Sequence, residues 1–146
     1  MFDRASQRRA VFLDRDGTIT RDVGYPHRVE DLELLPNASA GLSRMSALGY
    51  LLIITTNQSG VARGLFSEAD VQAFHQALCA LLKRDGVTIE AIYYCPFHPT
   101  EGQGQYRRDS PLRKPGDGML RLAAAEHELD LAASVAIGDK KSDILA

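Results

Sequence analysis

The sequence predicts an α/β fold: a doubly wound, mostly parallel sheet with helices on both faces and no large cap domain. Short apolar runs alternate along the chain with segments whose apolar residues recur at helical spacing. This alternation is typical of a parallel sheet with right-handed crossovers. Polar clusters follow the apolar runs, and in such folds the carboxyl ends of the strands bind ligands. We therefore look for function in these clusters.

The apolar runs predict strands, and the periodic segments predict helices that have recognisable ends. Asn37 and Gly49 bound the first helix, and Ser67 with Asp70 forms a capping box at the start of the second. The predicted strands span 10–14, 51–55, 89–94 and 134–137, and the predicted helices span 37–48, 67–85 and 118–130. A polar loop over 96–117 is long enough to be functional.

Length and composition indicate a single globular domain. The 146 residues are 45% apolar and 25% charged, with a net charge of −2 and two cysteines. This charge gives no general attraction to nucleic acid or anionic lipid, and two cysteines make no disulfide framework. We expect a cytoplasmic monomer with no nucleic-acid or membrane partner. Because the sequence predicts that a fresh helix begins at 144–146, we also expect the domain, residues 1–146, to be truncated at its C-terminus.

Two acids, Asp14 and Asp16, directly follow the first apolar run. Two carboxylates at one strand end repel each other unless a cation or a proton offsets their charge. Asp and Gly are also common turn residues, so the pair alone favours a turn. Further polar residues change that interpretation: Thr56 and Asp139 follow later predicted strands, and Lys114 precedes the helix predicted over 118–130. Carboxylates, a hydroxyl and a lysine in one cleft indicate a phosphate site with Mg²⁺.

These motifs resemble the haloacid dehalogenase (HAD) superfamily of phosphatases, which implies a Rossmann-like fold. The segments that carry the resemblance are Asp-Arg-Asp-Gly-Thr-Ile at 14–19, Thr-Asn-Gln-Ser-Gly-Val-Ala-Arg-Gly at 56–64, Arg-Lys-Pro at 113–115 and Gly-Asp-Lys at 138–140. Within the superfamily they are similar to the heptose 1,7-bisphosphate and histidinol-phosphate phosphatases. The resemblance therefore implies a Mg²⁺-dependent phosphomonoester hydrolase whose substrate is a small phosphorylated sugar, with heptose 1,7-bisphosphate losing its 7-phosphate as the best candidate.

The resemblance also assigns roles to individual residues. Asp14 corresponds to the nucleophile that forms an aspartyl-phosphate, and Asp16 to the general acid. Thr56 and Lys114 correspond to groups that hold the transferring phosphoryl oxygens. Asp139 would bind the metal with Asp14 and the backbone carbonyl of Asp16. The residues expected to contact the substrate are Asp22, Tyr25, Asn57, Gln58, Ser59, Arg63 and Arg113, and Arg107 or Arg108 could also hold a second phosphate.

One departure from the resembled group concerns zinc. That group often carries a Cys-x-His and Cys-x-Cys zinc loop, and the corresponding positions here are Cys95, Phe97, Ser110 and Leu112. A structural zinc site usually needs four Cys or His ligands. We therefore expect no zinc, and we interpret His98 as a loop residue or a substrate contact.

Several alternatives stay open. Thr56 could close a turn, Lys114 could be a solvated charge, Asp139 could cap a helix, and Asp143 could be a first-turn acid favoured by the helix dipole. A second enzymatic interpretation is a histidinol-phosphate or other small-metabolite phosphatase; a nucleic-acid end phosphatase is disfavoured by the acidic charge balance. A non-catalytic module that binds a phosphorylated ligand is the alternative from another class. His75 and His127 are expected on helix surfaces or flanks, and Cys79 is expected to be buried rather than reactive.

Overall fold

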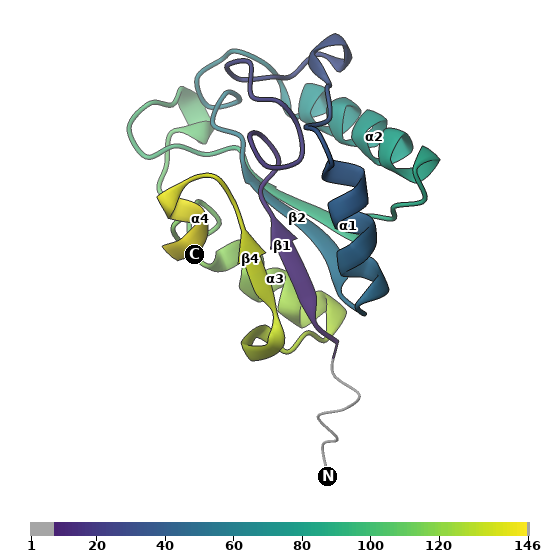
Figure 1. Ribbon diagram of the computed structural model, residues 1–146. Helices are drawn as coiled ribbons and strands as arrows, with labels where there is room; N and C mark the ends of the chain where they lie inside the picture. Colours follow the sequence, from purple (N-terminus) through teal and green to yellow (C-terminus); the bar gives the residue numbers. More distant parts are fainter. Residues whose placement is uncertain (1–7, 146) are drawn as a thin grey trace.

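A computed structural model describes residues 8–145, apart from the side chain of Ile144. Four parallel strands form one sheet in the order β3-β2-β1-β4, and the chain order of these strands requires crossovers (Figure 1). The strands are β1 (Ala10–Leu13), β2 (Leu51–Asn57), β3 (Ala91–Cys95) and β4 (Val135–Ile137). Because all four strands are parallel, their carboxyl ends lie along the same edge. The predicted fold class is confirmed.

The central strands of the sheet are buried on both faces, because alternate residues of β1 point to opposite sides and all four are buried. Val11 and Leu13 pack in one apolar cluster with Leu42 and Leu78, whereas Phe12 packs in another with residues of the opposite layer. Both clusters contain β2 residues as well, so β1 and the first four residues of β2 are continuously apolar, as buried parallel strands are. This two-faced burial makes the sheet a rigid platform for the side chains at its edge.

Helices cover each face, as Figure 1 shows. Helices α1 (Ala38–Ala47) and α2 (Glu68–Arg84) lie on one side, and α3 (Gly118–His127) lies on the other. The short α4 (Lys141–Leu145) follows β4 directly. Three 3-10 turns occupy Val29–Asp31, Gly104–Tyr106 and Leu131–Ala133. No helix in the described part of the chain is both long and apolar enough to cross a bilayer.

Element ends differ from the sequence prediction by a few residues. β2 continues to Asn57, because residues 53–57 pair with 91–95 of β3. α3 ends at His127 rather than at 130, because Glu128 adopts the left-handed conformation (φ 54°) and stops the helix. Ser67 and Asp70 form the predicted capping box at the start of α2. The extension of β2 matters for function, since it carries Thr56 and Asn57 on strand rather than turn backbone.

The long loop after β3 is tied to α2 by one carboxylate. The two oxygens of Glu68 accept hydrogen bonds from the hydroxyls of Tyr94 and Tyr106, each at 2.8 Å. The ring of Phe97 lies 6.0 Å from the Tyr106 ring, and the Arg108 guanidinium stacks over Phe97 at 4.1 Å. Aromatic and cation contacts of this kind each add a fraction of a kcal/mol to about 1 kcal/mol. These side-chain contacts order the loop. Of the four positions that correspond to zinc ligands in the resembled group, only Phe97 takes part in them.

We expect Glu68→Gln to loosen this loop. The substitution removes the charge that strengthens both tyrosine hydrogen bonds and leaves one of them without a good acceptor. The expected loss is about 1 kcal/mol of unfolding free energy, together with faster proteolysis within residues 96–112. Urea unfolding and limited proteolysis measure the two effects. Glu126→Gln on α3 is the control, and equal cleavage rates in the two variants would contradict the role given to Glu68.

Candidate active site

Asp14 begins a tight turn at the end of β1. Its backbone N–H donates to the carbonyl of Ile137 in β4 at 3.0 Å, and the turn closes when Ile19 and Thr20 both donate to the carbonyl of Arg15. Gly17 has φ 83°, a conformation that glycine adopts without strain. A Cβ at this position would also collide with the carboxylate of Asp139. The glycine thus allows the ends of β1 and β4 to approach each other.

Three carboxylates converge where β1 and β4 end. Asp14, Asp139 and Asp143 each place one carboxylate oxygen within 4.8 Å of the other two. Asp143 is buried, lies in α4 and accepts a hydrogen bond from the backbone N–H of Lys140 at 3.0 Å. Asp16 presents its side chain to a separate network, described below. Sequence reasoning treated Asp143 as a first-turn helix acid; its spacing of four residues from Asp139 was the available indication that both could face one point.

Lys114 supplies the cation of this cluster. Its Nζ lies 3.4 Å from Oδ1 of Asp14 and also donates to Asp143, and the side chain is almost fully buried. Asn57 fixes the lysine from β2: the Lys114 N–H donates to Asn57 Oδ1 at 3.0 Å, and Asn57 Nδ2 donates to the Lys114 carbonyl at 3.3 Å. Both ends of the Asn57 amide therefore position Lys114, a role that the sequence did not predict for it.

Thr56, Gln58 and Asp16 form the opposite wall. Gln58 Nε2 donates to Thr56 Oγ1 at 2.9 Å and to Asp16 Oδ2 at 3.2 Å. Thr20 Oγ1 donates to Asp16 Oδ1 at 3.3 Å. Thr56 and Gln58 are buried, whereas Asp16 is half-buried and lines the cavity outside. These contacts hold the Thr56 hydroxyl and the Asp16 carboxylate beside the carboxylate and lysine cluster.

Burial dominates the electrostatics of Asp14. Desolvation raises the pKa of its carboxyl group to about 6; Lys114 opposes this shift, and the neighbouring charge of Asp143 adds to it. The ionised form therefore stays costly even beside a lysine. A cation with two charges would relieve this cost more fully than Lys114 does.

The donor set fits Mg²⁺, which takes oxygen ligands and prefers a few carboxylates with water and substrate phosphate. All the clustered donors are carboxylate oxygens, and one of them, on Asp139, is exposed to solvent. Asp14, Asp139 and Asp143 are the side chains that would hold the ion. The carboxylate of Asp16 does not join this cluster, because it accepts four hydrogen bonds from neighbouring protein groups. Asp16 can therefore bind the metal only through its backbone carbonyl, which is the ligand that the sequence suggested.

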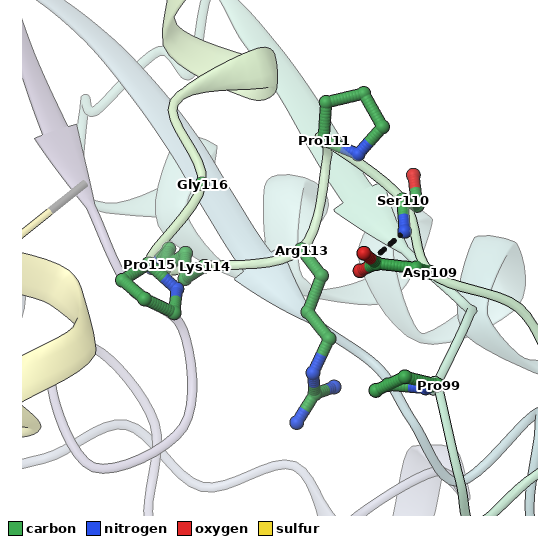
Figure 2. Close-up of a pocket in the computed structure, with 8 residues that line it drawn as sticks. All are labelled: Pro99, Asp109, Ser110, Pro111, Arg113, Lys114, Pro115 and Gly116. Atoms are coloured by element: carbon green, nitrogen blue, oxygen red, sulfur yellow. Dashed lines mark hydrogen bonds between the residues drawn. The ribbon is translucent and has the colours of Figure 1, made fainter.

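A cavity of about 630 Å³ opens over this cluster. Two of its lining residues are arginines: Arg63, which also lies 3.8 Å from Glu101 and 5.7 Å from the Tyr25 ring, and Arg113. Figure 2 shows the 109–116 loop, in which the Arg113 side chain extends toward Pro99. The other predicted substrate residues on the lining are Asp22, Tyr25, Asn57, Gln58 and Ser59. Arg107 and Arg108 are exposed on the loop outside it.

The structure also places four residues about which the sequence made lesser predictions, and the prediction for His75 is wrong. His75 is buried rather than on the helix surface, because its ring nitrogen meets the buried guanidinium of Arg15. Cys79 is only half-buried. His127 is half-buried, with Nδ1 3.9 Å from a Glu90 oxygen. His98 is a loop residue whose Nδ1 accepts hydrogen bonds from two backbone N–H groups, so its role is to hold a turn.

The parallel sheet, with its carboxylates and lysine at one edge, is the arrangement of HAD-superfamily phosphatases. The family model described as polynucleotide kinase 3 phosphatase matches residues 10–143. The D-glycero-beta-D-manno-heptose-1,7-bisphosphate 7-phosphatase of Haemophilus ducreyi is 44% identical over 140 residues, which cover 95% of this chain and 76% of that protein. The chain belongs to the heptose bisphosphate phosphatase family of the HAD superfamily, and it is a phosphatase.

Further relatives support this assignment. The alpha-anomer enzyme of Burkholderia mallei is 43% identical over 138 residues, covering 94% of this chain and 73% of that protein. A HAD-like phosphatase structure from Mesorhizobium loti has a TM-score of 0.91 and 36% identity, covering 96% and 67% of the two chains. The D,D-heptose 1,7-bisphosphate phosphatase of B. bronchiseptica, complexed with magnesium and phosphate, has a TM-score of 0.81 and 32% identity, covering 94% and 73%.

We expect magnesium to stabilise the protein more at pH 7.5 than at pH 5. The pKa of Asp14 is raised, so the folded protein holds a proton there up to about pH 6, and a metal must displace that proton below this value. Mg²⁺ at 5 mM should raise the unfolding temperature by several degrees at pH 7.5 and by much less at pH 5. Asp139→Asn should reduce the effect, and Asp117→Asn, an exposed control, should keep it. A shift that does not depend on pH would contradict this account.

Proposed function

We propose that this chain removes the 7-phosphate from D-glycero-D-manno-heptose 1,7-bisphosphate through an aspartyl-phosphate intermediate. The observation that carries the proposal is the junction of the carboxylate and lysine cluster with a 630 Å³ cavity that Arg63 and Arg113 line. Cavities of this size suit small metabolites. The inner groups suit the phosphate that reacts, and the arginines suit a second phosphate on the same molecule.

The residues divide the reaction between them. Asp14 attacks phosphorus while Asp16 gives its proton to the departing sugar oxygen; Asp16 then takes a proton from the water that hydrolyses the aspartyl-phosphate. Lys114 and Thr56 stabilise the phosphoryl oxygens. Bound Mg²⁺ supplies positive charge that offsets the repulsion between the attacking carboxylate and the anionic substrate. Asn57 and Gln58 keep the lysine and the threonine in place.

Phosphate release from a substrate panel tests this proposal. The panel contains both anomers of heptose 1,7-bisphosphate, heptose 7-phosphate, histidinol phosphate and a 3′-phosphorylated oligonucleotide. We expect one anomer of the bisphosphate to have a kcat/KM at least about tenfold above that of every other member. The oligonucleotide is included because the matching family model is described by a 3′ phosphatase. A kcat/KM for any member other than the two bisphosphate anomers that equals the value for the better anomer would overturn the substrate assignment.

Arg63→Met and Arg113→Met test whether these two arginines bind the second phosphate. Each should raise KM for the bisphosphate severalfold and leave KM for heptose 7-phosphate nearly unchanged, because only the bisphosphate has a second phosphate to lose contact with. Arg107→Met, on the exposed loop, should change neither value. Equal effects on both substrates would mean that the arginines bind the reacting phosphate instead.

We further propose that the 96–112 loop uses no zinc. Cys95 is buried and Ser110 occupies a buried position near it, with the Cys95 thiol directed to the Phe97 carbonyl at 3.9 Å. Addition of Zn²⁺ to the magnesium-loaded protein should therefore leave the unfolding temperature unchanged. Metal analysis of the purified protein that found one tightly held zinc per chain would contradict this expectation.

A further inference from the structure

A buried arginine lies directly under the candidate active site, and the reaction described above gives it no role. Arg15 stands between the two catalytic aspartates in sequence, and it is 0% exposed. A buried guanidinium is costly unless its charge is paired and its N–H groups are hydrogen-bonded. Its partners therefore show what its burial accomplishes.

The first partner is the carboxylate of Asp16. Arg15 Nε donates to Oδ1 at 2.8 Å and Nη2 donates to Oδ2 at 2.9 Å, which makes a two-pronged pair. Such pairs fix the plane of a carboxylate as well as its position. With Thr20 and Gln58 on its remaining sides, Asp16 is held in one orientation while it still lines the cavity.

The other partners anchor the arginine from α2 and from the segment between β1 and α1. Nη1 lies 3.1 Å from Nε2 of His75, the guanidinium stacks on the ring of Phe74 at 4.3 Å, and the carbonyl of Pro26 accepts from Nη2 at 3.0 Å. Because arginine only donates, His75 Nε2 must accept, so the ring is neutral with its proton on Nδ1. Burial, followed by the charge of Arg15, lowers the pKa of His75 to about 3, which keeps the ring in this form at neutral pH.

Gln58 joins this network to the phosphoryl-binding wall. Its Oε1 accepts from Arg15 Nη2 at 3.2 Å, while its Nε2 donates to Thr56 and to Asp16. The orientation of the amide is fixed, because only the oxygen can accept from arginine. Arg15 therefore sits at the centre of contacts that reach both the general acid and the phosphoryl-binding hydroxyl.

We propose that Arg15, anchored by His75 of α2, is a positioning residue that fixes the carboxyl group of Asp16 for proton transfer. This inference rests on the proposed function, in which Asp16 is the acid and base. When the bond from Asp14 to phosphorus forms and the bond from phosphorus to the sugar oxygen breaks, the proton on Asp16 Oδ1 moves to that oxygen. Oδ1 can carry this proton when the Thr20 hydroxyl donates to the Arg15 carbonyl, also 3.3 Å away, instead of to Asp16. When water attacks phosphorus and releases Asp14, Asp16 takes a proton from the water, which restores both groups.

Two substrates that differ in leaving group separate positioning from mere folding. The alkoxide of a sugar phosphate needs a proton as it leaves, whereas the phenolate of p-nitrophenyl phosphate does not. Loss of a general acid therefore lowers kcat/KM, which reports the first chemical step, far more for the sugar phosphate. The sugar phosphate used is whichever panel member the wild type hydrolyses fastest, so an error in substrate assignment shows in the wild type alone.

His75→Leu and His75→Gln are the matched variants. Leucine removes the acceptor and leaves a buried N–H of Arg15 unsatisfied, whereas glutamine can offer Oε1 at the same place. We expect His75→Leu to lower kcat/KM for the sugar phosphate by about 30-fold and for p-nitrophenyl phosphate by less than about threefold. His75→Gln should stay within about threefold of wild type on both substrates. Parallel losses on the two substrates, or no loss on either, would overturn the proposal.

Arg15→Lys gives a second, independent arm should His75→Leu fail to fold. Lysine keeps the charge but cannot make the two-pronged contact, so the same selective loss of about 30-fold or more is expected. In an Asp16→Ala background, Arg15→Lys should change the ratio of the two kcat/KM values no further, because the group it positions is gone. A further loss of similar size in that background would show that Arg15 acts by some other route, and would overturn the proposal while leaving the phosphatase assignment intact.

Discussion

Replacing Asp14 with Asn is expected to lower phosphatase turnover by about four orders of magnitude or more while the protein stays folded. The amide has almost the same shape as the carboxylate but cannot attack phosphorus, so the reaction loses its covalent route. Asp14 is the one carboxylate that lies at the end of β1, is buried in the three-carboxylate cluster and contacts Lys114. Phosphate release with the preferred sugar phosphate and saturating magnesium measures the loss.

The same variant is expected to be at least as stable as the wild type, which is the opposite of what a folding defect would cause. Because burial raises the pKa of Asp14 to about 6, its ionisation costs stability as pH rises from about 4 to 6. A neutral amide avoids this cost, so at pH 7.5 without magnesium Asp14→Asn should unfold at a temperature equal to or above that of the wild type. A lower unfolding temperature, or turnover close to the wild-type rate, would contradict the role given to Asp14.

Replacing Lys114 with Met is expected to have the second-largest effect, a loss of about three orders of magnitude in kcat. In the proposed mechanism the buried lysine ammonium stabilises negative charge on the transferring phosphoryl group, and a preorganised group of this kind contributes several kcal/mol. Its removal also leaves Asp14 and Asp143 close together without the charge that now pairs with both. Steady-state kinetics with the sugar phosphate gives the loss in kcat.

Magnesium binding separates this electrostatic role from simple damage to the site. Without the lysine, two carboxylates have no competing cation, so Lys114→Met should bind magnesium at least as tightly as the wild type, as measured by calorimetry. Lys140→Met is the matched control, because Lys140 lines the same cavity but is exposed, and it should keep kcat within about tenfold. A Lys114→Met variant with wild-type kcat, or with greatly weakened magnesium binding, would argue against the account.

The fold followed from the sequence because its main determinants are local. Each of the four strands is a short apolar run, and Ser67 with Asp70 marks the start of α2 chemically. The shift at β2 arose because Thr56 and Asn57 are ordinary turn residues that strand pairing with β3 keeps extended. The early end of α3 depends on a left-handed Glu128, which no local preference favours.

The site was predictable where motif residues act directly and less so where they act through others. Asp14 and Asp139 were expected near each other because each follows a strand, and Lys114 was expected beside them because its motif directly precedes α3. The contribution of Asp143 depends on how α4 turns after Gly138, whose Cβ, if it had one, would collide with that side chain. Spacing alone could not distinguish this carboxylate from a helix-capping acid.

The buried arginine network shows why some functional residues escape sequence reasoning. His75 lies sixty positions from Arg15 along the chain, and on a helical projection it looks like one polar residue beside an apolar stripe. Only the packing of α2 against the end of β1 brings it to the guanidinium. Asn57 and Gln58 are similar cases, since their motif suggested substrate contacts and their amide groups instead hold Lys114, Thr56 and Asp16.

The central claim is that Asp14 carries the phosphoryl group during turnover. The direct measurement is to quench the magnesium-loaded enzyme with acid while it hydrolyses the sugar phosphate, reduce it with borohydride and locate the reduced residue by mass spectrometry. An aspartyl-phosphate is reduced to homoserine, so the account predicts homoserine at position 14 and none in Asp14→Asn. Homoserine at another position, or an unmodified Asp14 when a burst of sugar equal to the enzyme concentration has been released, would contradict it.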